Sequence, residues 1–74
     1  MKAHAKVKVN KNKLKWPEKY YIHKAEEYDI KCEIEHMHIG IIYNEYNLIL
    51  NGTKENIESF FGYLKMMGFK IEQF

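Results

Sequence analysis

The most constraining feature of this sequence is a stripe of large apolar residues near its end. The stripe consists of Ile57, Phe60, Phe61, Leu64 and Met67. Steps of three and four residues place side chains on one face of an α-helix. Asn51-Gly52 supplies a turn before the stripe, Thr53 suits the N-cap position, and Gly68 suits the left-handed residue that ends a helix. We therefore predict a helix between Thr53 and Gly68 that holds a sheet with its apolar face.

Four other segments alternate apolar and polar residues with the period of a strand that buries one face. They run from Ala3 to Val9, from Ile30 to Ile39, from Tyr46 to Asn51, and from Phe69 to Glu72. Gly40 to Glu45 is expected to form the loop of a hairpin. The sequence thus predicts four strands, the last of which follows the apolar helix directly.

A second helix is predicted from about Pro17 to Glu27, after a polar connection from Asn10 to Lys15. Proline is tolerated at the first helical position, where its missing N–H leaves no hydrogen bond unmade. The residues expected to pack this rather polar helix are Tyr21, Ile22, Ala25 and Tyr28.

The second strand changes phase along its length. Its apolar residues form two sets on opposite faces: Ile30, Cys32 and Ile34, and then Met37 and Ile39. One extra residue in a strand reverses the face used by every later side chain, so a β-bulge near Glu35 and His36 would restore the phase. Such a bulge would turn His36 and His38 away from the core.

The order of elements is β, α, β, β, α, β, which is the plan of a ferredoxin-like α+β fold. We expect one domain over residues 1–74, with both helices on one face of a four-stranded antiparallel sheet. The other face would stay open and polar, with Asn47, Lys70 and Glu72 among its residues, and we expect any ligand or partner to bind there. The candidate residues on this surface are Lys6, Lys8, Glu33, His36, His38 and Ile49.

Charge is distributed unevenly along the chain. Residues 1–24 hold eight Lys and one Glu (+7), and residues 25–74 hold four Lys and nine acidic residues (−5), which sum to the net charge of +2. A basic segment attracts nucleic acid, anionic lipid or an acidic protein, although a solvated strand and loop is the simplest interpretation. No apolar run approaches the roughly 20 residues of a membrane span. The single cysteine fits a reducing compartment, so we expect a cytoplasmic protein.

The sequence contains no convincing catalytic or metal-binding set. Cys32, His36 and His38 are suitable ligands for zinc, but no compact further ligands complete a tetrahedral site. A catalytic cysteine needs an electropositive setting, and the acidic neighbours Glu33 and Glu35 would instead raise the pKa of the Cys32 thiol. We therefore expect a non-enzyme without a metal or other cofactor.

Nucleic-acid binding is an alternative, because lysines and aromatic residues are mixed near the start of the chain. These residues are Lys6, Lys8, Lys11, Lys13, Lys15, Trp16, Tyr20 and Tyr21. Lysines neutralise phosphates and aromatic rings stack on bases. The aromatic motif that RNA-binding sheets of this architecture carry on their open face is absent, so this function is not favoured.

Two segments of the chain resemble the NIL domain, a ferredoxin-like regulatory module. The matching residues in the first segment are Tyr28, Ile30, Cys32, Ile34, Met37 and Ile39, and those in the second are Leu48, Leu50, Gly52, Glu55, Ile57, Tyr63, Leu64, Gly68, Ile71 and Glu72. The tripeptide Asn-Ile-Leu that names the family is here Glu33-Ile34-Glu35.

The resemblance implies a regulatory function. NIL domains occur at the end of methionine importer ATPases, where they bind methionine and inhibit transport, and beside archaeal ferredoxin modules. This chain contains neither an ATPase nor a CxxCxxC motif, so similarity implies a detached sensing or assembly module. We expect it to form a homodimer through its sheet or an edge strand and to bind an amino acid such as methionine at that junction. The alternative is a protein-interaction or inhibitor domain, of viral or plasmid origin, that acts through the basic N-terminal face.

Overall fold

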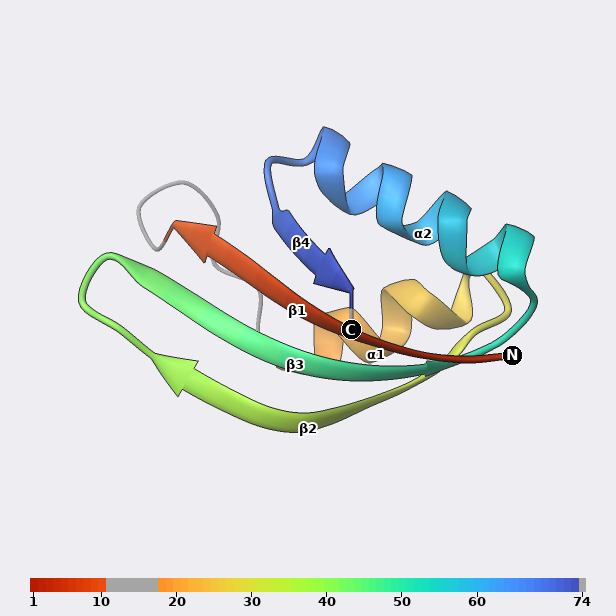
Figure 1. The fold of residues 1–74 in the computed structure, drawn as a ribbon, viewed down its shortest axis with the longest axis horizontal. Helices are drawn as coiled ribbons and strands as arrows, with labels where there is room; N and C mark the ends of the chain where they lie inside the picture. The colour runs from red at the N-terminus through yellow and green to blue at the C-terminus, as the bar shows by residue number, and fades with distance from the viewer. Residues whose placement is uncertain (11–17, 74) are drawn as a thin grey trace.

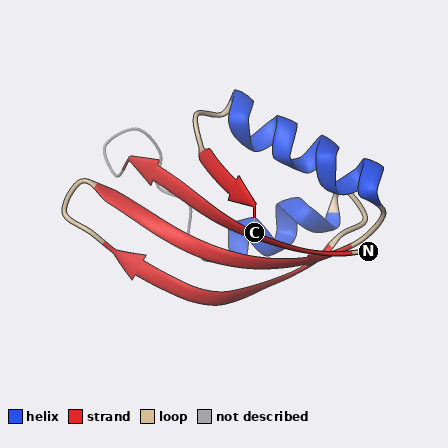
Figure 2. Ribbon diagram, viewed as in Figure 1, coloured by secondary structure: helices blue, strands red, loops and turns tan. Residues whose placement is uncertain are grey.

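The computed structural model describes residues 1–10 and 18–73. Its elements are β1 (Lys2–Asn10), α1 (Glu18–Glu26), β2 (Lys31–Ile39), β3 (Tyr43–Asn51), α2 (Lys54–Met66) and β4 (Lys70–Gln73). The strands form one antiparallel sheet in the order β2-β3-β1-β4, and the two helices lie against it (Figures 1 and 2). The predicted ferredoxin-like α+β fold is confirmed. The assignment of Asn10 to the polar connection was wrong, because Asn10 is the last residue of β1 and pairs with Tyr43. The rest of that connection, residues 11–15, and the start of the first helix at Pro17 lie outside the described residues.

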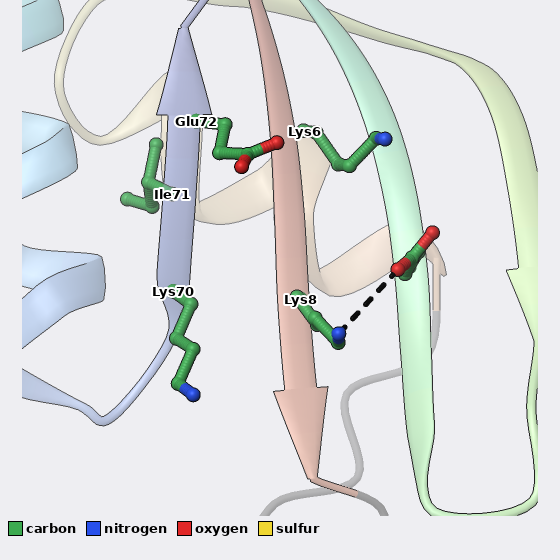
Figure 3. A pocket seen from close by; sticks show the side chains of 6 residues that line it. Lys6, Lys8, Lys70, Ile71 and Glu72 are labelled. Carbon is green, nitrogen blue, oxygen red and sulfur yellow. Dashed lines mark ion pairs between the residues drawn. The ribbon is translucent and has the colours of Figure 1, made fainter.

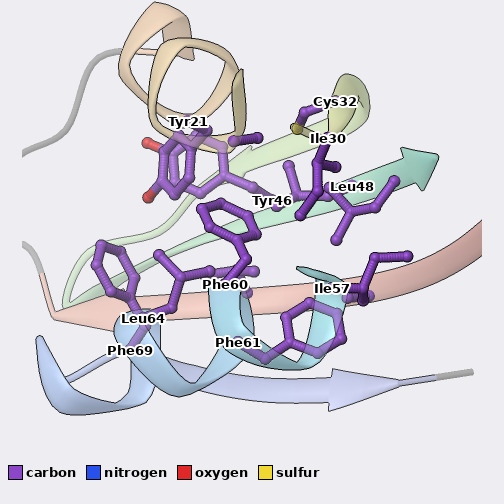
Figure 4. Close-up of a cluster of buried hydrophobic side chains, with 14 of the residues drawn as sticks. Tyr21, Ile30, Cys32, Tyr46, Leu48, Ile57, Phe60, Phe61, Leu64 and Phe69 are labelled. Carbon is purple, nitrogen blue, oxygen red and sulfur yellow. The ribbon is translucent and has the colours of Figure 1, made fainter. Parts of the chain in front are cut away.

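The core lies between the helices and one face of the sheet (Figure 4). The central strand β1 contributes Ala5, Val7 and Val9, which confirms the alternation read from the sequence. The side chain of Tyr21 on α1 packs against Tyr46 of β3, with ring centroids 4.7 Å apart. The helix that looked polar in the sequence is therefore held to the sheet by aromatic contact.

Helix α2 begins and ends as its sequence predicts. The Thr53 hydroxyl accepts a hydrogen bond of 3.1 Å from the Asn56 backbone N–H, and Gly68 adopts a φ of 98° after the helix. Four of the five stripe residues are buried, but the inclusion of Met67 was wrong, because its side chain is 41% exposed. The chain turns toward β4 at this point, and the buried Phe69 occupies the core after the turn.

The predicted bulge in β2 is present. Ile34 lies opposite Leu48 and His36 lies opposite Asn47, so Glu35 is the extra residue. The predicted loop from Gly40 to Glu45 was too long, because β3 already begins at Tyr43. The hairpin carries exposed apolar side chains near its turn: Met37, Ile39, Ile41 and Ile42.

Candidate functional site on the open sheet face

The register of the strands defines the side chains on the sheet face opposite the helices. Residues directly opposite one another share a face, and their neighbours along each strand point the other way. Two rows therefore cross this face: His36, Asn47, Lys6 and Glu72, and then His38, Glu45, Lys8 and Lys70. The adjacent row toward the start of β1 contains Glu33, Ile49 and His4.

All six candidate residues from the sequence lie on this open face, but they do not form one cluster. Lys6 and Lys8 line a hollow over β1, β3 and β4, whereas Glu33, His36, His38 and Ile49 lie toward β2 and do not line it. Their role as a ligand or partner surface remains a prediction.

The hollow has a volume of about 480 Å³, which lies in the range of small-molecule sites (Figure 3). It is lined by Lys6, Lys8, Glu45, Lys70, Ile71 and Glu72. The sequence placed Lys70 and Glu72 on the open face, but they were not among the candidate binding residues. Glu45 was assigned to the hairpin loop. Alternation in the last strand identifies the face of Lys70 and Glu72, but only the sheet order places them beside Lys6 and Lys8.

Charged groups of both signs surround the hollow. The Lys8 ammonium lies 3.8 Å from the Glu45 carboxylate. The Lys8 and Lys70 ammonium groups also lie 4.7 and 5.8 Å from the centroid of the Tyr43 ring, within the range of cation–π attraction. Within residues 1–10 and 18–73, Lys6, Lys70 and Glu72 form no ion pair. Two ammonium groups and one carboxylate are thus available to a ligand.

The bulge contributes a second polar contact on the open face. Glu35 Oε2 lies 3.9 Å from Nδ1 of His4, so the extra residue of β2 reaches across β3 to β1. In the described part of the chain, no three His, Cys, Asp or Glu side chains come together in a way that could hold a metal ion.

The Cys32 side chain faces the core and is only 5% exposed. Burial raises the pKa of its thiol to about 12, and the nearby charge of Glu33 adds to this effect. The sequence indicated the direction of this shift from the acidic neighbours, but desolvation is the larger cause. A thiol in this state is a poor nucleophile at neutral pH.

We predict that Cys32 reacts with a disulfide reagent at pH 8 on the order of a hundredfold more slowly in the native protein than in urea, because few native thiols are ionised. The unfolded thiol ionises near its ordinary pKa of 9.0, so the stabilising contribution of the neutral thiol is present below pH 9 and is lost as the pH rises toward 12. The reaction rate is measured from the absorbance of the thiol that the reagent releases. For the pH dependence of stability, Cys32→Ala is the control, because this variant has no thiol to ionise. Equal native and denatured rates would contradict burial of the thiol.

No helix in the described ranges is long and apolar enough to cross a membrane.

The fold and the hollow define a small ferredoxin-like α+β domain with an open, charged sheet face. The fold is similar to the C-terminal domain of an ABC transporter ATP-binding protein from Enterococcus faecalis, with a TM-score of 0.75 and 18% identity over 96% of this chain and 81% of that chain. It is also similar to the de novo designed protein Foldit4, with a TM-score of 0.62 and 13% identity over 99% of this chain and 91% of that chain. The sequence matches no protein-family model and no curated protein. At these identities, the likeness establishes the fold alone.

Proposed function

We propose that this chain is a small, non-catalytic regulatory module of the NIL type that binds an amino acid at its open sheet face. The observation that carries the proposal is the hollow lined by both lysines and glutamates. An amino acid is a zwitterion, so its carboxylate complements the ammonium group of Lys6 and its ammonium complements the carboxylate of Glu72, which lies opposite Lys6. Charge-assisted hydrogen bonds of this kind are among the stronger polar contacts in proteins.

Two further observations support a regulatory function. The similar domain from Enterococcus faecalis is the C-terminal domain of an ABC transporter ATP-binding protein, which is compatible with a small regulatory module. The sequence resemblance to NIL domains makes methionine the first ligand to test. Because the hollow is open on one side, a second copy of the chain packed on the same face would enclose the ligand, so we propose binding at the junction of a homodimer.

The proposal is tested by isothermal titration of the full chain with methionine and the other common amino acids, combined with light scattering. We expect saturable heat with at least one amino acid and a shift from monomer to dimer on binding. Glu72→Gln should weaken binding because it removes the carboxylate partner of the ligand ammonium. The control Lys54→Gln changes an exposed residue of α2 and should bind normally. The proposal fails if no amino acid gives heat and the protein remains monomeric.

A further inference from the structure

The hollow has an excess of positive charge at one end. Lys8 lies directly opposite Lys70 in the pairing of β1 with β4, whereas Lys6 lies opposite Glu72. Like charges directly opposite one another on a sheet destabilise the strand pair. Both ammonium groups are also drawn to the same aromatic ring, that of Tyr43. Two positive charges are therefore concentrated at the Lys8–Lys70 end.

The neighbouring carboxylates compensate for only part of this charge. Glu45 contacts Lys8 at 3.8 Å, and both side chains are partly exposed to solvent. Lys70 has no carboxylate partner among residues 1–10 and 18–73. The lining of the hollow includes three lysines and two glutamates, which leaves one positive charge uncompensated. A neutral zwitterion would not remove this excess.

We propose that the preferred ligand of the open face is an acidic amino acid, with its second carboxylate bound between Lys8 and Lys70. The inference rests on the proposed function and specifies its ligand class. The ligand ammonium faces Glu72 and its α-carboxylate faces Lys6. The two rows of charged residues are two positions apart along the strands, a separation of about 7 Å, so a ligand with acidic groups at both ends can contact both rows. The net charge of −1 on an acidic amino acid matches the one uncompensated positive charge of the hollow.

Lys70 could instead serve to prevent aggregation, and this role must be distinguished from ligand binding. β4 is an edge strand, and charged side chains on edges prevent two sheets from joining. If Lys70 served only that purpose, Lys70→Gln would increase self-association and leave ligand preference unchanged. The two explanations therefore predict different outcomes for the same variant.

The test is isothermal titration of the full chain at low salt with aspartate, glutamate, methionine and succinate, the last being a dicarboxylate without an ammonium group. We expect the better acidic amino acid to bind roughly tenfold more tightly than methionine, the effect of one charge-assisted hydrogen bond. Lys70→Gln should abolish this preference while the methionine affinity stays the same. Lys54→Gln is the matched control, and circular dichroism checks that each variant is folded.

The outcomes separate the two proposals. If methionine binds as tightly as the acidic amino acids, or if Lys70→Gln retains the preference, the acidic subsite is wrong and the amino-acid function stands. If succinate binds in a Lys70-dependent manner and no amino acid binds, the amino-acid function and the acidic amino acid as its ligand are both wrong, and the hollow is a site for dicarboxylates instead. If none of the four compounds binds, the acidic ligand is wrong, and the amino-acid function is wrong as well unless another common amino acid binds.

Discussion

Replacing Phe60 with alanine is expected to lower the free energy of unfolding by about 3–5 kcal/mol. Phe60 is fully buried on α2, and its ring lies 5.6 Å from the ring of Tyr28 (centroid to centroid). Truncation removes the transfer free energy of the ring and leaves a cavity between helix and sheet. A domain of 74 residues has a total stability of about 4–11 kcal/mol at the usual value per residue. The substitution therefore removes a large share of the stability.

Urea denaturation followed by far-UV circular dichroism measures this loss. Met66→Ala is the matched control, because Met66 lies on the same helix but is 77% exposed, and its truncation should change stability by less than about 0.5 kcal/mol. Phe60→Leu keeps most of the volume and provides an intermediate value if Phe60→Ala does not fold. Similar losses for Phe60→Ala and Met66→Ala would contradict the packing of α2 on the sheet.

Gly40→Ala is expected to destabilise the protein by about 2 kcal/mol, within the range for steric overpacking. Gly40 lies in the turn of the β2–β3 hairpin, and its N–H donates a hydrogen bond of 2.9 Å to the Tyr43 carbonyl oxygen. A Cβ at Gly40 would collide with that same backbone oxygen. Because backbone atoms cannot rotate away as a side chain does, the hairpin must open to accept the methyl group.

Gly62→Ala is the control for this substitution, and we expect it to stabilise the protein, whereas Gly40→Ala destabilises it. Gly62 is an exposed position in α2, and apart from the adjacent helix backbone and its two chain neighbours a Cβ there would meet no atom within 4 Å. Alanine favours the helix over glycine by about 1 kcal/mol, so Gly62→Ala should raise the denaturation midpoint. A comparison of both variants in urea separates the local clash from a general effect of adding a methyl group. A loss of stability at both positions would refute the proposed clash.

Local periodicity predicted most of the elements of this fold. The stripe that ends at Leu64 identified α2, and the phase change after Ile34 located the bulge at Glu35. The errors occurred at the ends of elements. Met67 continues the helical spacing but lies where the chain turns, and Tyr43 was assigned to a loop although it pairs with Asn10. Helix and strand ends depend on contacts with other segments, which the spacing along one segment does not contain.

The candidate site was predictable only in part. Alternation placed Lys6, Lys8, Lys70 and Glu72 on the open face. It could not show that the hollow gathers Lys6 and Lys8 with Lys70 and Glu72 rather than with Glu33 and His36. Glu45 and Tyr43, which both interact with Lys8, were not recognised because the predicted loop included them.

With the exception of Met67, the sequence by itself determined which side chains of the predicted helices and strands face the core, because the periods of helix and strand are properties of neighbouring residues. The tertiary structure decided which solvent-facing residues meet. Pairing of β1 with both β3 and β4 brought residues more than 60 positions apart in the chain, Lys8 and Lys70, directly opposite one another. Strand order and register depend on contacts between distant segments, and these contacts created the charged hollow.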